Sequence, residues 1–268
     1  MSLCNKLRGA LGCFANSFFL FRRIRHLPAR CIMNKHVFTF FTWALLGTVC
    51  ALAQPRPNVL VILTDDQRWD ALGVVQRELG DRALFPWFKT PNLDRLAAEG
   101  ARFANVFITT SLCSPGRATL LSGRYARSHK VLNNFTEYPN ELPSYPRRLK
   151  EAGYETAYIG KWHMGEDNDE QRPGFDFWMS HRGQGNYFDN EFNVNGTRQP
   201  LPGFYTTVVT DRAVDWLKRP HPKPWLLILG DRALRGAASE GHHGSVLRTA
   251  AQRKDAGLAH ILSLRIQL

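Results

Sequence analysis

The sequence predicts an α/β fold with a mostly parallel central sheet and helices on both faces of that sheet. Residues 58–63 and 225–229 are almost continuously apolar, which is typical of strands that are buried on both faces. Residues 154–159, between Gly153 and Gly160, form a third expected strand. Patterns typical of helices separate these segments. Since parallel strands need a crossover between them, this alternation favours a parallel sheet.

The elements between these strands are predicted from their end signals. Residues 90–100 are expected to form a helix with Thr90 at its N-cap, Pro91 in its first turn and Gly100 past its end. Residues 102–107 are expected to be the next strand. Further helices are expected in three segments: the one that follows Cys113, 145–152 and 207–218.

The N-terminal part of the chain indicates export to the periplasm or out of the cell. Residues 33–53 are interpreted as a secretory signal peptide, because a short basic start leads into an apolar run and a small-x-small cleavage site before Gln54. No stable membrane span is then expected after cleavage, although a retained anchor is the alternative. Residues 1–32 are interpreted as a mis-assigned start or a disordered segment. Residues 54–230 form the main domain.

Residues 231–268 differ in composition from the main domain. They contain no Phe, Trp, Tyr or Pro, whereas residues 54–230 contain 23 aromatic residues. This change indicates an altered, frameshift-like tail, and a divergent helical extension is the alternative. If the sheet ends after 225–229, the edge of that strand is expected to be exposed, since the tail has little with which to cover it.

The charge of the chain does not favour nucleic-acid binding. The formal net charge is +12. If this excess of positive charge were spread over the whole chain, it would suggest a polyanionic partner. Residues 54–230, however, carry 22 Lys and Arg against 20 Asp and Glu. The excess of positive charge therefore belongs to the two ends, and we expect no nucleic-acid partner.

Cys113 is the only cysteine after residue 50. It cannot form a disulfide within the main domain, so a chemical role is expected for it. It opens the pattern Cys-x-Pro-x-Arg, which ends at Arg117, and it precedes an expected helix whose N-terminal N–H groups favour an anion. Asp65 and Asp66 end the first expected strand, and adjacent carboxylates there suit Ca²⁺ or Mg²⁺.

Lys161 and His163 follow the expected strand 154–159 in the run Gly-Lys-Trp-His. Because they alternate, both side chains are expected to point the same way across a pleat. A lysine there can neutralise the oxygens of an anion, and a histidine can hydrogen-bond the nucleophile or the substrate.

The three blocks resemble those of the formylglycine-dependent sulfatases, in the alkaline-phosphatase-like superfamily. They are the strand that ends in Thr-Asp-Asp, the Cys-x-Pro-x-Arg pattern and the Lys-x-His pattern. The resemblance implies that a formylglycine-generating maturation enzyme oxidises Cys113 to 3-oxoalanine (formylglycine), whose hydrate attacks sulfur in covalent catalysis. Gly116 stands where the family most often has serine.

The resemblance also implies roles for the other residues. Asp65 and Asp66, together with residue 113, would hold a calcium ion. Arg117 would hold the hydrate of the aldehyde. The remaining two residues would contact the sulfate and the nucleophile: Lys161 and His163.

The substrate implied by the resemblance is a sulfated carbohydrate. Residues 172–178, 183–185 and 193–196 resemble bacterial sulfatases that act on N-acetylglucosamine 6-sulfate and related glycans. The alternatives are a phosphate or phosphonate monoester hydrolase of the same superfamily and a non-catalytic, glycan-binding remnant. The family also uses an Asp-Asn pair, a second histidine and a further lysine, for which this sequence offers no match. We therefore expect the 268-residue chain to hydrolyse sulfate esters weakly or not at all.

Overall fold

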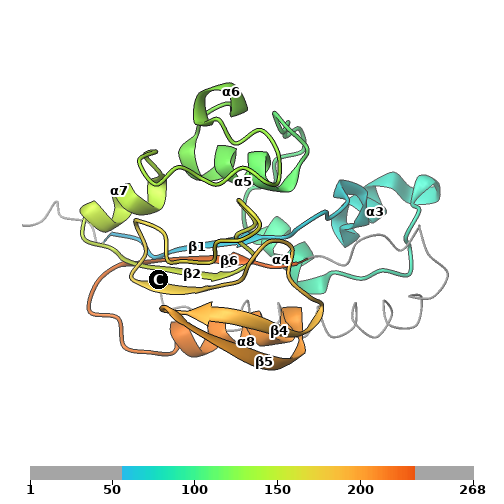
Figure 1. Cartoon of the computed structure of the whole chain (residues 1–268). Helices are drawn as coiled ribbons and strands as arrows, with labels where there is room; N and C mark the ends of the chain where they lie inside the picture. The colour runs from blue at the N-terminus through green and yellow to red at the C-terminus, as the bar shows by residue number, and fades with distance from the viewer. Residues whose placement is uncertain (1–55, 233–268) are drawn as a thin grey trace, which may run out of the picture. The chain divides into compact units, whose positions relative to one another are not determined.

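The computed structural model describes residues 56–232, which contain one six-stranded sheet (Figure 1). The strands lie side by side in the order β1-β6-β2-β3-β4-β5. The first four are mutually parallel, and β4 and β5 continue the sheet as an antiparallel hairpin. The strand bounds are β1 (Val59–Leu63), β2 (Glu155–Gly160), β3 (Phe177–Ser180), β4 (Phe188–Val194), β5 (Thr197–Phe204) and β6 (Trp225–Gly230).

Helices cover both faces of the sheet, so the predicted fold class is confirmed. α8 lies on one side, whereas α5, α6 and α7 lie on the other (Figure 1). No helix within residues 56–232 is long and apolar enough to cross a membrane. The α-helix bounds are α3 (Gly73–Leu79), α4 (Pro91–Glu99), α5 (Cys113–Ser122), α6 (Ala126–His129), α7 (Tyr145–Glu151) and α8 (Tyr205–Leu217), and the two 3-10 helices are η2 (Trp69–Ala71) and η3 (Gly80–Arg82).

The core under α8 explains why β6 is apolar at every position. All six residues of β6 are buried, because β6 lies between β1 and β2 with helices on both faces. Leu227 and Leu229 face α8, where they pack with Val209 and Ala213. Leu226 and Ile228 face the opposite helices. A strand in this position needs no polar side, as the sequence predicted.

A cluster of buried aromatic rings fills the other face. Tyr158 of β2 stacks on Trp178 of β3 with 5.2 Å between ring centroids, and Trp162 and Phe175 pack edge-on against these rings. Such pairs contribute about 0.5–1.5 kcal/mol beyond the area they bury. Trp162 is the residue between Lys161 and His163, so this cluster anchors the segment that follows β2.

The predicted helices at 90–100, after Cys113, at 145–152 and at 207–218 are confirmed as α4, α5, α7 and α8. Thr90 occupies the N-cap of α4, but its hydroxyl accepts a hydrogen bond from the Gly73 N–H at 2.7 Å instead of capping its own helix. The N-cap thus ties α4 to α3.

Two predictions about strands are wrong. Residues 102–107 form no strand, and Phe103 and Phe107 are 79% and 91% exposed. The local pattern suits a strand, but no neighbour among the described residues pairs with it. The expected exposed edge at 225–229 is also wrong, because β6 is central and β1 is at the edge of the described sheet. All five residues of β1 are accordingly only partly buried.

The sequence did not predict β3, β4 and β5. The β4–β5 hairpin turns at Asn195 and Gly196, both with positive φ, the conformation for which Asn-Gly is the preferred pair. The predictions for residues 1–32, the signal peptide at 33–53 and the altered tail at 231–268 lie outside the described residues, apart from positions 231 and 232.

Candidate active site

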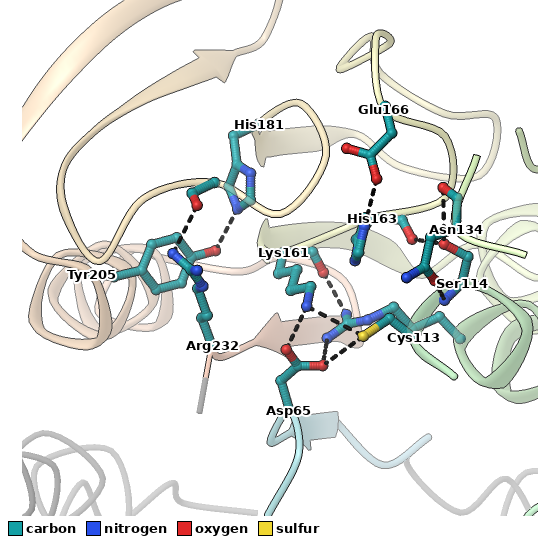
Figure 2. Close-up of polar contacts among 12 residues, drawn as sticks. Asp65, Cys113, Ser114, Asn134, Lys161, His163, Glu166, His181, Tyr205 and Arg232 are labelled. Carbon is teal, nitrogen blue, oxygen red and sulfur yellow. Dashed lines mark hydrogen bonds and ion pairs between the residues drawn. The ribbon is translucent and has the colours of Figure 1, made fainter. Parts of the chain in front are cut away.

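The residues singled out from the sequence meet at the carboxyl edge of the sheet. Asp65 follows β1, Lys161 follows β2, and Cys113 begins α5. Because β1, β6 and β2 are parallel and in register, the segments after them leave the sheet at the same edge, where open α/β folds bind their ligands. Figure 2 shows Asp65, Cys113 and Lys161 pointing toward one another.

The Asp65 carboxylate lies at the centre of this group. Lys161 Nζ donates a hydrogen bond to Asp65 Oδ2. Arg117 Nη2 lies 3.4 Å from Asp65 Oδ1, and the Cys113 sulfur lies 3.6 Å from the same oxygen. Lys161 Nζ is also 3.5 Å from the Cys113 sulfur. The thiol is therefore held beside one carboxylate and two cations.

Burial and charge act in opposite directions on these groups. Asp65, Arg117 and Lys161 are all less than a tenth exposed. Burial raises the pKa of Asp65, but Lys161 and Arg117 outweigh burial and lower it. Burial lowers the pKa of Lys161 more than Asp65 raises it. Asp65 is therefore ionised, and its negative charge is what makes two buried cations at one site tolerable.

Arg117 is fixed by the backbone as well as by Asp65. Its Nη1 donates to the carbonyl oxygen of Lys161 at 2.5 Å, and the Tyr158 hydroxyl donates to the same oxygen. The guanidinium therefore joins α5 to the end of β2. This arrangement holds the cation beside residue 113 even when no anion is bound.

Helix α5 begins at Cys113. The preceding residue, Leu112, is the N-cap and has an extended backbone, and its carbonyl oxygen accepts a hydrogen bond from the Gly116 N–H at 2.9 Å. The Ser114 N–H donates to the side-chain oxygen of Asn134 at 3.1 Å. The Ser114 hydroxyl donates to the carbonyl oxygen of His163. The helix start is thus attached directly to the Lys-x-His segment.

Lys161 and His163 do reach the same site. The sequence predicted that they would do so as alternate residues of a pleated strand, and this part of the prediction is wrong. β2 ends at Gly160, and His163 has a φ of +45°. The chain leaves the sheet and turns, with Trp162 buried in the aromatic cluster between the two residues. The His163 ring is buried, and its Nε2 lies 3.0 Å from Glu166 Oε1.

A metal ion can be held by the residues that the sequence predicted. One atom each from Asp65, Asp66 and Cys113 lies within 4.8 Å of the other two. Two carboxylates suit a hard cation such as Ca²⁺, whereas a thiol is a soft ligand. The donor set therefore fits calcium best when residue 113 presents an oxygen, as formylglycine would.

Several residues of the site were not predicted: Ser114, Asn134, Tyr158 and Glu166. Ser114 lies inside the Cys-x-Pro-x-Arg block, so its place in the motif was a usable signal. Glu166 follows His163 by three residues, but its contact depends on the turn at His163, which has no clear local pattern. Asn134 is brought to the site only by the tertiary fold, whereas Tyr158 lies in β2, three residues before Lys161, and its contact depends on how the chain turns after Gly160.

Most of the described chain is similar to known proteins of one family. The family model described as Sulfatase matches residues 57–232. The N-acetylglucosamine-6-O-sulfatase of Bacteroides thetaiotaomicron is 32% identical over 182 residues, which cover 66% of this chain and 30% of that protein. The mouse N-acetylgalactosamine-6-sulfatase is 30% identical over 268 residues, 82% of this chain and 49% of that protein. This chain thus spans about half the length of these relatives or less.

A solved structure shows the same fold. It is a protein in complex with its substrate, D-glucosamine-2-N,6-O-disulfate, and it is 30% identical to this chain with a TM-score of 0.61. The match covers 72% of this chain and 38% of that one.

Proposed function

This chain belongs to the sulfatase family, and we propose that it acts as a sulfuric ester hydrolase that releases sulfate from a sulfated glycan. One observation carries the proposal. The Cys113 sulfur lies at the start of a helix, within hydrogen-bonding reach of the buried Lys161 ammonium and beside the Asp65 carboxylate. A nucleophile at this position would lie beside the positive charges of Lys161 and Arg117, which can bind an anionic ester.

In this proposal each side chain has one task. Residue 113, after conversion to formylglycine by a maturation enzyme, carries the attacking hydroxyl. Lys161 and Arg117 hold the sulfate oxygens and the hydroxyl in place through fixed positive charge. A calcium ion held by Asp65 and Asp66 supplies, when bound, the charge that favours the deprotonated nucleophile.

We propose that the substrate is a glycan of the N-acetylglucosamine 6-sulfate type. Two of the similar proteins, one by its name and the other by its bound glucosamine sulfate, support this class. Residues 172–178, 183–185 and 193–196, which resemble that group in sequence, belong to the segments around β3, β4 and β5. Within these segments Gly183 lies against Glu166, which in turn contacts the His163 ring.

The test uses the full chain, co-expressed with a formylglycine-generating enzyme. Mass spectrometry of the peptide that contains residue 113 measures its conversion from thiol to aldehyde. Hydrolysis of 4-methylumbelliferyl sulfate and of the matching phosphate is then measured with and without added Ca²⁺. We expect conversion, and a slow, Ca²⁺-dependent sulfatase activity that Cys113→Ala abolishes. The activity is expected to be slow because residues 56–232 offer the cation three positions, whereas Ca²⁺ takes about 6–8 oxygen ligands.

Three results would contradict the proposal. The thiol could stay intact in the presence of a competent maturation enzyme. The phosphate ester could be hydrolysed faster than the sulfate ester. Sulfate release could survive Cys113→Ala. Comparing N-acetylglucosamine 6-sulfate with N-acetylgalactosamine 6-sulfate tests the glycan class, and preference for the second sugar would overturn that part alone.

A further inference from the structure

We infer that Glu166 is a positioning residue, which fixes the tautomer of His163 so that Nδ1 of the imidazole accepts a proton at the site of residue 113. This inference rests on the proposed function in one respect only. The hydroxyl that loses the proton belongs to the formylglycine proposed at position 113. The tautomer itself is a property of the chain as it stands.

The contact between the two side chains determines which ring nitrogen carries the proton. His163 Nε2 lies 3.0 Å from Glu166 Oε1. An ionised carboxylate only accepts hydrogen bonds, so Nε2 must carry the hydrogen of a neutral ring and Nδ1 must carry the lone pair. Glu166 thus selects one of the two tautomers.

The lone pair on Nδ1 is in turn available. Nδ1 is buried and has no hydrogen-bond partner among residues 56–232. A buried polar atom without a partner is uncommon, and such an atom calls for a functional explanation. The two nitrogens point away from each other across the ring. The ring is close enough to Lys161 and Arg117 for both charges to lower its pKa, and in Figure 2 it lies between Glu166 and the group formed by Lys161 and Cys113. Nδ1 is the ring nitrogen that does not face Glu166.

The ring is held in this orientation from the backbone as well. His163 has a φ of +45°, a conformation that few non-glycine residues adopt. The hydroxyl of Ser114, next to residue 113, donates to the His163 carbonyl oxygen. A strained backbone that is attached to the start of α5 is typical of a residue whose side chain must be placed accurately.

Gly183 makes room for the Glu166 carboxylate. A Cβ at position 183 would lie 2.0 Å from Glu166 Oε2, and Gly183 has a φ of +49°. Any side chain there would displace the carboxylate from His163 or strain the loop. This gives a specific task to Gly183, which the sequence singled out only through the resemblance of residues 183–185 to one group of sulfatases.

The surroundings keep the His163 ring neutral. Burial lowers its pKa most, the nearby Lys161 charge lowers it further, and Glu166 raises it without overcoming both. A neutral imidazole can accept a proton, whereas an imidazolium cannot. In the step that we infer, the O–H bond of the hydroxyl on residue 113 breaks, its electron pair stays on oxygen, and the proton forms an N–H bond at Nδ1.

The tautomer can be measured without activity, metal or formylglycine. Long-range ¹H–¹⁵N correlation spectra of the full chain, with ¹⁵N-labelled histidine at neutral pH, distinguish Nδ1–H from Nε2–H, and His163→Gln assigns the signal. We expect the Nε2–H form in the unsubstituted chain.

Glu166→Ala is expected to give a mixture of tautomers, and Gly183→Ala is expected to move the signal in the same direction. Glu166→Gln, whose carbonyl oxygen can still accept, is expected to retain most of the Nε2–H form. Glu170→Ala, which removes an exposed carboxylate of the same segment, is the matched control and is expected to leave the spectrum unchanged.

A kinetic measurement completes the test in the formylglycine-bearing chain. General base catalysis contributes roughly 10²–10⁴-fold to the rate of a reaction. Glu166→Ala is expected to remove part of this contribution, so that kcat for 4-methylumbelliferyl sulfate falls while KM changes little. An Nδ1–H tautomer in the unsubstituted chain, or a tautomer that Glu166→Ala leaves unchanged, would overturn the inference. Neither result would bear on the proposed function, which depends instead on the conversion and the activity of residue 113.

Discussion

Substituting Gly160 by alanine is expected to damage the carboxyl edge of the sheet, from which the site is built. Gly160 has a φ of +106°, and a Cβ there would lie 2.1 Å from the carbonyl oxygen of Gly230 and 2.9 Å from its carbonyl carbon. These are backbone atoms of β6, which is held between β1 and β2. No rotation of a side chain can therefore relieve the overlap.

The magnitude has two parts. An alanine at this φ costs about 1–3 kcal/mol of backbone strain, and forcing an extra carbon into packed structure costs typically about 1–3 kcal/mol. Gly160→Ala is thus expected to lower the free energy of unfolding by about 2–6 kcal/mol. For a domain of this size each kcal/mol lowers the melting temperature by about 2–4 °C, so a fall of about 4–24 °C is expected.

The assay is thermal unfolding followed by circular dichroism, with Gly196→Ala as the control. Gly196 has a similar φ of +95°, but no atom lies within 4 Å of the position that a Cβ would take there. This variant therefore suffers the backbone strain without the overlap and is expected to lose only about 1–3 kcal/mol. Equal losses of melting temperature in the two variants would refute the reasoning, because the contact with Gly230 would then contribute nothing.

Three further predictions concern the site itself. Cys113→Ala is expected to shift the melting temperature, measured by calorimetry, by only a few degrees. It is also expected to prevent the conversion of residue 113, which mass spectrometry measures. A large loss of stability would contradict this prediction. Asp65→Asn leaves the buried Lys161 ammonium without its negative partner, so we expect a loss of about 3–5 kcal/mol in urea unfolding, and Lys161→Met in the same background should recover part of it. Finally, the pKa of Asp65 is lowered in the folded chain, so its contribution to stability is present above the unfolded value near 4 and is lost as the pH falls through the folded pKa. Stability measured between about pH 5 and pH 2 should therefore fall less steeply in Asp65→Asn.

The parts of the fold that the sequence predicted well are those in which local pattern and tertiary environment agree. The segment at 225–229 is apolar throughout because it is the central strand, and nothing in its surroundings contradicts its own preference. Three of the site residues were also predictable, because Asp65 and Lys161 follow strands and Cys113 begins a helix at the carboxyl edge. Their chemistry needs no knowledge of how the strands are ordered.

The errors arise where the environment decides. Residues 102–107 have a pattern suited to a strand, but a strand needs a partner, and the sequence does not say where one lies. The β4–β5 hairpin was missed for the opposite reason. Its Asn195-Gly196 turn is a strong signal, but polar residues and the prolines at 200 and 202 interrupt the alternation on both sides. Glu166 was missed because its role depends on the turn at His163.

The proposed metal ion and the proposed anionic substrate can be tested together through the charges of the site. Asp65 and Asp66 formally balance Lys161 and Arg117, so the four side chains together are neutral. A divalent cation bound to the two carboxylates would leave the site with two positive charges. A sulfate ester carries one negative charge, and a deprotonated hydroxyl on residue 113 carries another. Bound Ca²⁺ would therefore offset these negative charges, and substrate binding is expected to strengthen with Ca²⁺. Isothermal titration of the full chain with a sulfated monosaccharide, with and without Ca²⁺, measures this coupling, and equal affinities would show that the four side chains do not act as one charge-balanced unit.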